Sequence, residues 1–239
     1  MIRDRKYILT PELLLSYSKA ALKNARALWD ESCALIDSSH YPRAYFLACA
    51  SIEETGKAFI AFNSINRKLK NGAVQNAIND YFQTHHFKLS MGLICLLINH
   101  QITEKSGKQF LDTAFNLYVG REASFYADIQ GDGIITIPRE LVRPKVAMQT
   151  ADLADEALTA TRQYFLKEDP PQYSEMDDKA FVISRQRKCL QMLQLSNFWW
   201  FYFDILKKYN NDPNTAHNVA IVYYWENYFS RNKTWKGNT

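Results

Sequence analysis

The chain has 239 residues, of which 47% are hydrophobic and 23% charged, and its formal net charge is +4. This composition is typical of a globular protein with a core, and so mild a charge does not by itself indicate a nucleic-acid partner. No window approaches about 18 uninterrupted apolar residues, so no membrane span is expected. The four cysteines show no CxxC spacing, which predicts reduced thiols and a cytoplasmic location.

The first half of the chain predicts two long helices that form an antiparallel hairpin. Thr10-Pro-Glu12 combines an N-cap residue, a proline at the first helical position and an acid in the first turn. This helix is expected to end within residues 38–42, and a second helix to run from there to about residue 70. Small residues recur along the second helix, so its backbone can approach a neighbour closely.

Three further helices are expected to complete the bundle. A short helical piece at residues 74–82 precedes a third helix at residues 84–100, a fourth begins after residue 107, and a fifth spans residues 143–167. Turn residues and a short β-branched run predict a loop or small hairpin near residues 128–140. The predicted fold class is therefore an all-α antiparallel bundle with a hairpin insertion.

A boundary is predicted at Asp169-Pro-Pro171, because two successive prolines end a helix. The predicted domains are a bundle at residues 1–169 and a C-terminal helical extension at residues 170–239 that packs on it. Two or three helices are expected in this extension, which is rich in tryptophan and tyrosine.

A carboxylate lies on the predicted packing face of the second helix. Glu54 shares a stripe with Ser51 and Ala58, whereas Glu53 and Lys57 have the spacing of a solvated ion pair. A glutamate on an apolar stripe needs a partner, because burying an unpaired charge is costly. Glu54 is therefore either a structural anchor or part of a site.

Two other helices place ionisable groups on their inward stripes. His86, next to His85, begins the stripe of the third helix, and Arg121 and Asp128 lie two turns apart on the fourth. Helix packing would bring Glu54, His86 and Arg121 into one polar pocket. Such a pocket suits phosphodiester chemistry, with histidine as acid/base and arginine on a phosphate. The paired Glu-x-x-His motifs of di-iron bundles are missing, so neither a metal nor another cofactor is expected.

An ordered set of short motifs resembles the AbiV family of abortive-infection proteins. The resemblance covers about residues 9–168, and the aromatic C-terminal section lies outside it. The matching segments are Leu9-Thr-Pro-Glu12, Tyr41-Pro-Arg-Ala-Tyr45, Ser51-Ile-Glu-Glu-Thr-Gly-Lys57, His85-His-Phe-Lys88 and Arg121-Glu-Ala-Ser-Phe-Tyr-Ala-Asp128.

The AbiV family is similar to the HEPN superfamily of helical bundles, many of which are metal-independent ribonucleases that act as dimers. The resemblance implies a HEPN-like bundle, antiphage defence through RNA or translation, a homodimer, and a phage or host protein as trigger. HEPN nucleases usually carry an arginine four to six residues before a histidine on one helix. None of the five histidines here has an arginine at that distance. Any catalytic pair must therefore come from different helices.

On this interpretation His86 is the general acid/base, Arg121 stabilises charge on the phosphate and Glu54 orients one of them. A one-residue error in helix phase would exchange His86 for His85. The predicted supporting residues are Glu53, Lys57, His85, Lys88, Tyr126 and Asp128. The alternative is a non-enzymatic helical interaction protein that binds a phage or host protein, in which the same residues form a structural ion-pair network.

Overall fold

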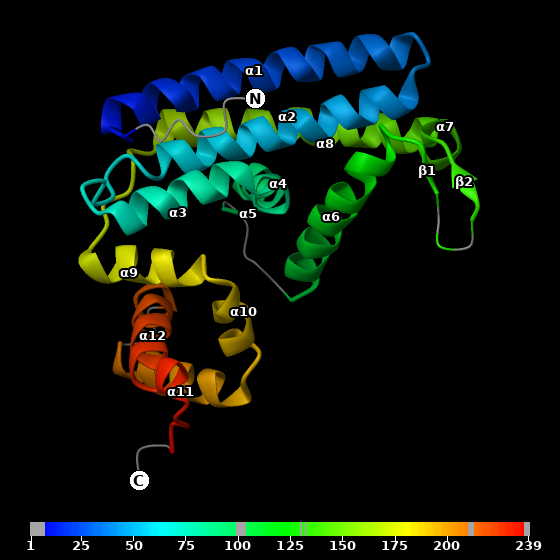
Figure 1. Cartoon of the computed structure of the whole chain (residues 1–239). Helices are drawn as coiled ribbons and strands as arrows, with labels where there is room; N and C mark the ends of the chain where they lie inside the picture. Colours follow the sequence, from blue (N-terminus) through cyan, green and yellow to red (C-terminus); the bar gives the residue numbers. More distant parts are fainter. Residues whose placement is uncertain (1–7, 99–103, 130, 132, 210–212, 237–239) are drawn as a thin grey trace. The chain divides into compact units, whose positions relative to one another are not determined.

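The structure is a computed structural model that describes residues 8–98, 104–129, 131, 133–209 and 213–236. It is all-α apart from one small hairpin, which confirms the predicted fold class (Figure 1). The chain forms two compact units. The bundle unit comprises Leu9–Ile65 and Ile78–Pro170, and the second unit comprises Met1–Ile8, Asn66–Ala77 and Pro171–Thr239.

Three long helices form the frame of the bundle unit: α1 (Pro11–Asp37), α2 (Tyr41–Phe62) and α8 (Pro144–Lys167). α1 begins at the predicted N-cap, where the Thr10 hydroxyl accepts a hydrogen bond from the Leu13 amide at 3.2 Å. α1 and α2 form the expected antiparallel hairpin, and both pack against α8 (Figure 1). α2 is the central helix, because it also packs against α4.

Small hydroxyl side chains lie between α1 and α2 and bond across the contact. Ser32 donates to the Ala44 carbonyl at 2.8 Å, and Ser51 donates to the Ala25 carbonyl at 2.7 Å. The turn between the helices contains Ser39 at φ 61°, a left-handed conformation that glycine adopts more readily. These contacts explain why small residues recur along α2.

The remaining bundle elements differ in part from the predicted helices. The third predicted helix is divided into α4 (His85–Leu93) and α5 (Cys95–Ile98), and its last two predicted residues lie outside the described part of the chain. α2 ends at Phe62, well before residue 70. The other elements of this unit are α6 (Glu104–Ala123), β1 (Asp128–Ile129), β2 (Ile135–Thr136) and α7 (Pro138–Leu141).

The fourth predicted helix is too long at its C-terminal end. α6 stops at Ala123, where the Ser124 hydroxyl donates to the Arg121 carbonyl at 2.6 Å. Asp128 therefore lies in β1, paired with Thr136 of β2, and not on a helical stripe with Arg121. The predicted hairpin is present at this position.

The second unit is built from α9 (Glu175–Ser184), α10 (Arg187–Leu193), α11 (Ser196–Lys208), α12 (Pro213–Asn227) and the 3-10 helix η1 (Phe229–Arg231). These are more helices than the two or three predicted. Their core is aromatic and includes Phe198, Phe201 and Tyr224. α3 (Gly72–Gln83) contributes residues to both units.

Residues 66–77 are tied to this unit by a buried ion pair. Arg67 Nη1 lies 2.8 Å from Asp178 Oδ1, and its guanidinium lies between the rings of Tyr173 and Phe181, each 3.8 Å away. The other Asp178 oxygen accepts a hydrogen bond from the Lys68 amide at 2.9 Å. An internal segment thus belongs to the same compact unit as the C-terminal helices. Among the described residues, no helix has the length and apolarity that crossing a bilayer demands.

Candidate functional site

Among the described residues of the bundle unit, one carboxylate is buried: that of Glu53 on α2, which three basic side chains contact. His85 Nδ1 lies 2.8 Å from Glu53 Oε2, and Lys88 Nζ lies 2.9 Å from the same oxygen. Arg121 Nε lies 2.9 Å from Oε1, in an ion pair whose N–H direction misses hydrogen-bond geometry. We call these four residues the Glu53 cluster. They come from three helices: α2, α4 and α6.

Close contact of α2 with α4 places Glu53 against His85 and Lys88. A Cβ atom on Gly56 would lie 2.8 Å from the Lys88 carbonyl carbon and 2.9 Å from the Gly92 nitrogen. A Cβ on Gly92 would in turn lie 3.0 Å from the Ile52 carbonyl carbon. Only glycine at these two positions allows the backbones to approach so closely. His85 and Lys88, three residues apart at the start of α4, then face the same carboxylate.

A third glycine lets the end of α6 approach α2. A Cβ on Gly120 would lie 2.5 Å from the Tyr45 hydroxyl oxygen. The next residue, Arg121, therefore reaches Glu53, and its guanidinium also lies 5.2 Å from the ring centroid of Phe46. Arg121 is in the last turn of α6, where a cation interacts favourably with the helix dipole.

Beneath Glu53, α2 presents neutral groups. Burial raises the pKa of the Cys49 thiol to about 12, although a hydrogen bond with Tyr45 opposes the rise. Burial, and then the neighbouring Cys49, also raise the pKa of the Tyr45 hydroxyl. Both side chains are therefore protonated at neutral pH. The ion pairs around this place are those of Glu53 with Lys88 and Arg121, and of Arg121 with Glu122.

The cluster is buried at one end and accessible at the other. The side chains of Glu53 and Lys88 are only 7% and 6% exposed, whereas that of His85 is 43% exposed. An ionised carboxylate can only accept hydrogen bonds, so His85 Nδ1 must carry the hydrogen. Nε2 of the neutral ring is then free to accept a proton. A second carboxylate, that of the exposed Glu122, lies 3.7 Å from Arg121 Nη1, so two carboxylates balance the charges of Lys88 and Arg121.

The cluster differs from the predicted catalytic set at two of its three positions, each shifted by one residue along its helix. Arg121 is in it as predicted, but Glu53 and His85 stand where Glu54 and His86 were expected. Glu54 pairs with Lys57 along α2, away from the cluster. Burial alone would lower the pKa of Lys57, but its hydrogen bond to Glu54 and the charge of that carboxylate outweigh burial and raise it. The structure thus places the predicted supporting pair of Glu53 and His85 at the centre of the cluster.

The remaining predicted residues lie outside the cluster. His86 is exposed, and its ring packs edge-on against Tyr118 with centroids 5.8 Å apart. Tyr126 is exposed and contacts the ring of Phe125, with centroids 5.0 Å apart. Asp128 is exposed in β1 and accepts a hydrogen bond from the Ile129 amide at 2.8 Å. Of the supporting residues, only Glu53, His85 and Lys88 meet around one point.

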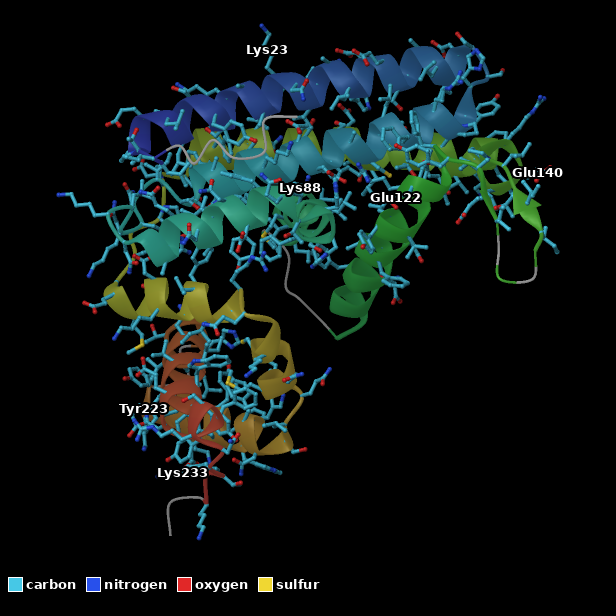
Figure 2. The ribbon with its side chains drawn as sticks, in the orientation of Figure 1. Lys23, Lys88, Glu122, Glu140, Tyr223 and Lys233 are labelled. Atoms are coloured by element: carbon cyan, nitrogen blue, oxygen red, sulfur yellow. The ribbon has the colours of Figure 1, made fainter. Side chains whose placement is uncertain are left out.

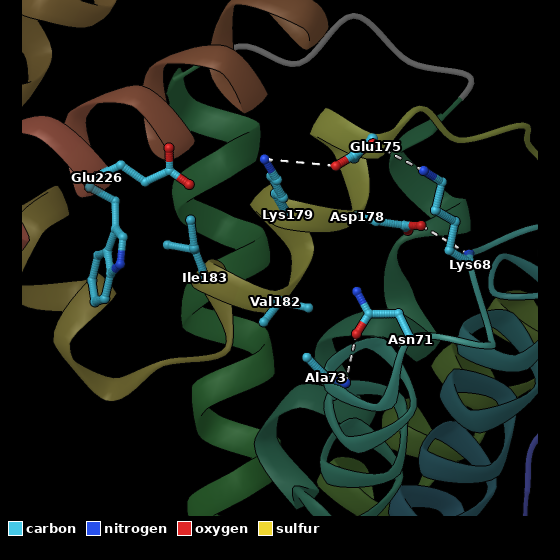
Figure 3. Close-up of a pocket in the computed structure, with 10 residues that line it drawn as sticks. Lys68, Asn71, Ala73, Glu175, Asp178, Lys179, Val182, Ile183 and Glu226 are labelled. Atoms are coloured by element: carbon cyan, nitrogen blue, oxygen red, sulfur yellow. Dashed lines mark hydrogen bonds and ion pairs between the residues drawn. The ribbon is translucent and has the colours of Figure 1, made fainter.

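Each compact unit also contains a hollow. In the second unit, a cavity of about 430 Å³ is lined by charges that pair with one another (Figure 3). There Lys68 Nζ lies 3.2 Å and Lys179 Nζ 3.8 Å from the Glu175 carboxylate. The bundle unit has a larger groove of about 770 Å³ that includes Arg43 and Arg139. No residue pattern indicated this groove in advance, although Arg43 lies in one of the motifs.

No group of three His, Cys, Asp or Glu side chains in the described ranges is arranged to hold a metal ion. The Glu53 cluster has two such residues, and the other two positions around the carboxylate are filled by cations. A lysine and an arginine in direct contact with the carboxylate do not favour a divalent cation there.

The helical bundle places the chain in the class of HEPN-like all-α proteins. The family model described as AbiV (HEPN_AbiV) matches residues 13–159, more than half of the chain, and the chain belongs to this family of abortive-infection proteins. Comparisons with curated proteins and with solved structures found no significant match. The matched range contains all four residues of the Glu53 cluster.

Proposed function

We propose that this protein is an abortive-infection effector that cleaves RNA at the Glu53 cluster. The observation that carries the proposal is the geometry of His85, whose Nδ1 is held 2.8 Å from a buried carboxylate while the ring is 43% exposed. A carboxylate that orients a histidine and favours one tautomer is a recurrent arrangement for general acid–base catalysis. Membership of the AbiV family supports a role in defence.

In the proposed reaction, His85 Nε2 takes the proton from a ribose 2′-hydroxyl. The 2′ oxygen attacks the adjacent phosphorus, the bond from phosphorus to the 5′ oxygen breaks, and the imidazolium returns its proton to that leaving oxygen. The Arg121 guanidinium, whose side chain is 16% exposed, stabilises the charge on the phosphate oxygens. The products are a 2′,3′-cyclic phosphate and a 5′-hydroxyl end. The homodimer and the phage or host trigger are parts of the proposal with no residue assigned.

The adjacent histidines provide a matched pair of variants. Wild type, His85→Ala and His86→Ala would be expressed in bacteria, with and without phage challenge, while growth and total RNA integrity are followed. We expect wild type and His86→Ala to arrest growth with RNA fragments that end in a cyclic phosphate. His85→Ala should allow growth with intact RNA, and circular dichroism of the purified proteins should show equal helicity. Fragmentation that survives His85→Ala would contradict the proposal.

A second candidate function is binding of a phage or host protein without catalysis. It is favoured by exposed apolar side chains on α6 and the hairpin, among them Phe115, Val119, Ile129 and Ile135. Contiguous exposed apolar residues are typical of protein-interaction surfaces. In this case the Glu53 cluster would act as a structural network. Growth arrest with intact RNA, together with unfolding of the His85→Ala and Arg121→Ala proteins, would support this function over the nuclease.

A further inference from the structure

The groove of about 770 Å³ in the bundle unit lies where three segments meet. Its wall is formed by the turn between α1 and α2, the turn that follows α6, and the segment that contains α7. We call it the Arg43 groove. Its lining residues include His40, Tyr41, Arg43, Ser124, Phe125 and Arg139.

The Arg43 groove is basic. His40, Arg43 and Arg139 line it, and all three are exposed. No aspartate or glutamate is among its lining residues in the described part of the chain, and there neither arginine lies within ion-pair distance of a carboxylate. Arginines that are not neutralised by the protein are available to an anionic ligand, and their planar guanidinium matches a phosphate.

Aromatic rings stand beside these arginines. Tyr41 is partly exposed in the wall, and Phe125 is exposed with its ring held against Phe46, centroids 4.6 Å apart and planes at 31°. Aromatic rings next to a basic groove are the pattern by which proteins bind single-stranded nucleic acid, because each base stacks on a ring while each phosphate meets a cation. An acidic peptide would use the arginines but would have no need of the exposed rings.

The groove adjoins the Glu53 cluster. Phe46 contacts a residue of each: its ring centroid lies 4.6 Å from that of Phe125 in the groove and 5.2 Å from the Arg121 guanidinium. Ser124, in the groove wall, donates to the Arg121 carbonyl at 2.6 Å. The rings of Phe125 and Phe46 thus connect the groove wall to Arg121.

We propose that the Arg43 groove binds single-stranded RNA next to the Glu53 cluster, with Arg43 and Arg139 on phosphates and Tyr41 and Phe125 under bases. This inference rests on the proposed ribonuclease function, and it names the part of the surface that holds the substrate strand. It makes substrate binding separable from the chemical step, because the two sets of side chains do not overlap.

The test measures binding of a short fluorescein-labelled single-stranded RNA to the full-length protein by fluorescence anisotropy across a salt series. Arg43→Glu/Arg139→Glu should weaken binding at least about 100-fold and reduce the magnitude of the slope of log affinity against log salt by about 1.4, for two lost phosphate contacts. Phe125→Ala should weaken binding roughly 10-fold through lost stacking. Arg43→Gln/Arg139→Gln, a milder pair, would be used if the charge reversal fails to fold.

The matched control is Lys19→Glu/Lys23→Glu, which changes the net charge equally. Both lysines are exposed on α1, and Lys23 projects away from that helix (Figure 2). This control should leave the affinity within about a factor of three, because screened charges at a distance contribute little. Equal loss in both double variants, or no loss in the arginine pair, would overturn the inference. The inference would also be overturned if polyglutamate competed as strongly as unlabelled RNA and Phe125→Ala left RNA binding unchanged. The groove would then bind an acidic protein segment.

Cleavage measured on the same samples distinguishes this inference from the proposed function. RNA that binds in the groove without being cleaved would refute the ribonuclease and support the groove. Cleavage by wild type that is equally efficient in the arginine pair at low RNA concentration would refute the groove and leave the ribonuclease. His85→Ala should bind RNA like wild type, because His85 lies outside the groove.

Discussion

Gly56→Ala should destabilise the bundle unit strongly for so small a change. The added Cβ would lie 2.8 Å from the Lys88 carbonyl carbon and 2.9 Å from the Gly92 nitrogen, both of them backbone atoms of α4. Backbone cannot rotate away as a side chain can, so α2 and α4 must separate. Overpacking of this kind costs about 1–3 kcal/mol, and we take about 3 because both obstacles are backbone. Alanine recovers about 1 kcal/mol through its higher helix propensity, which leaves a net loss of about 2 kcal/mol.

The assay is urea denaturation followed by circular dichroism at the helix minimum. At a typical slope of about 2 kcal/mol per molar urea, the midpoint should fall by about 1 M. Gly72→Ala is the matched control, because no atom lies within 4 Å of its added Cβ and the residue begins α3. Its midpoint should be unchanged or slightly raised. A Gly56→Ala protein as stable as wild type would refute the argument that glycine is needed for this helix contact.

Three further predictions concern other parts of the chain. Glu53→Ala should lower the free energy of unfolding, measured by urea denaturation, by about 3–5 kcal/mol because it leaves Lys88 buried without a partner. Glu54→Ala should lower it by less than about 1 kcal/mol, and equal losses in the two variants would contradict the described burial. Ser39→Gly should raise the free energy of unfolding by about 1 kcal/mol, since φ 61° suits glycine, and a loss of stability would show that the serine side chain matters more than its backbone. Burial lowers the pKa of His217, so the unfolded chain binds a proton more readily and the second unit should lose stability as the pH falls below about 6.5. In thermal unfolding between pH 7 and pH 5, the stability of the His217→Gln protein should depend less on pH than that of wild type. An equal pH dependence in the two proteins would count against the burial of this ring.

The helix starts and the hairpin could be predicted because their signals are local. Thr10 and Pro11 define the start of α1 through side-chain and backbone chemistry within one turn. The hairpin follows from turn residues next to a β-branched run. The end of α2 could not be predicted in this way. At that end the side-chain amide of Asn63 donates to the Phe59 carbonyl. The side-chain oxygen of Asn63 accepts a hydrogen bond from the Tyr164 hydroxyl, 101 positions away in the chain.

The composition of the Glu53 cluster was predictable only to within one residue. Adjacent residues on a helix point about 100° apart, and a small-residue helix such as α2 has apolar neighbours over much of its circumference. The stripe that contains Glu54 is therefore hardly more apolar than the one that contains Glu53. What selects Glu53 is the close contact with α4 at Gly56 and Gly92, a property of two distant segments. The convergence of one acid, one histidine and Arg121 was visible in the sequence, whereas the phase of each helix was not.

The ion pair between Arg67 and Asp178 has a consequence for the order of synthesis. The two residues are 111 positions apart. A ribosome that adds about 5–20 residues per second places Asp178 in the chain roughly 6–22 s after Arg67. During that interval α1 and α2 are already available to pair with each other, while the guanidinium of Arg67 lacks both its carboxylate and its two aromatic rings. The second unit therefore closes only after Asp178 has been added, around a segment made 111 residues earlier.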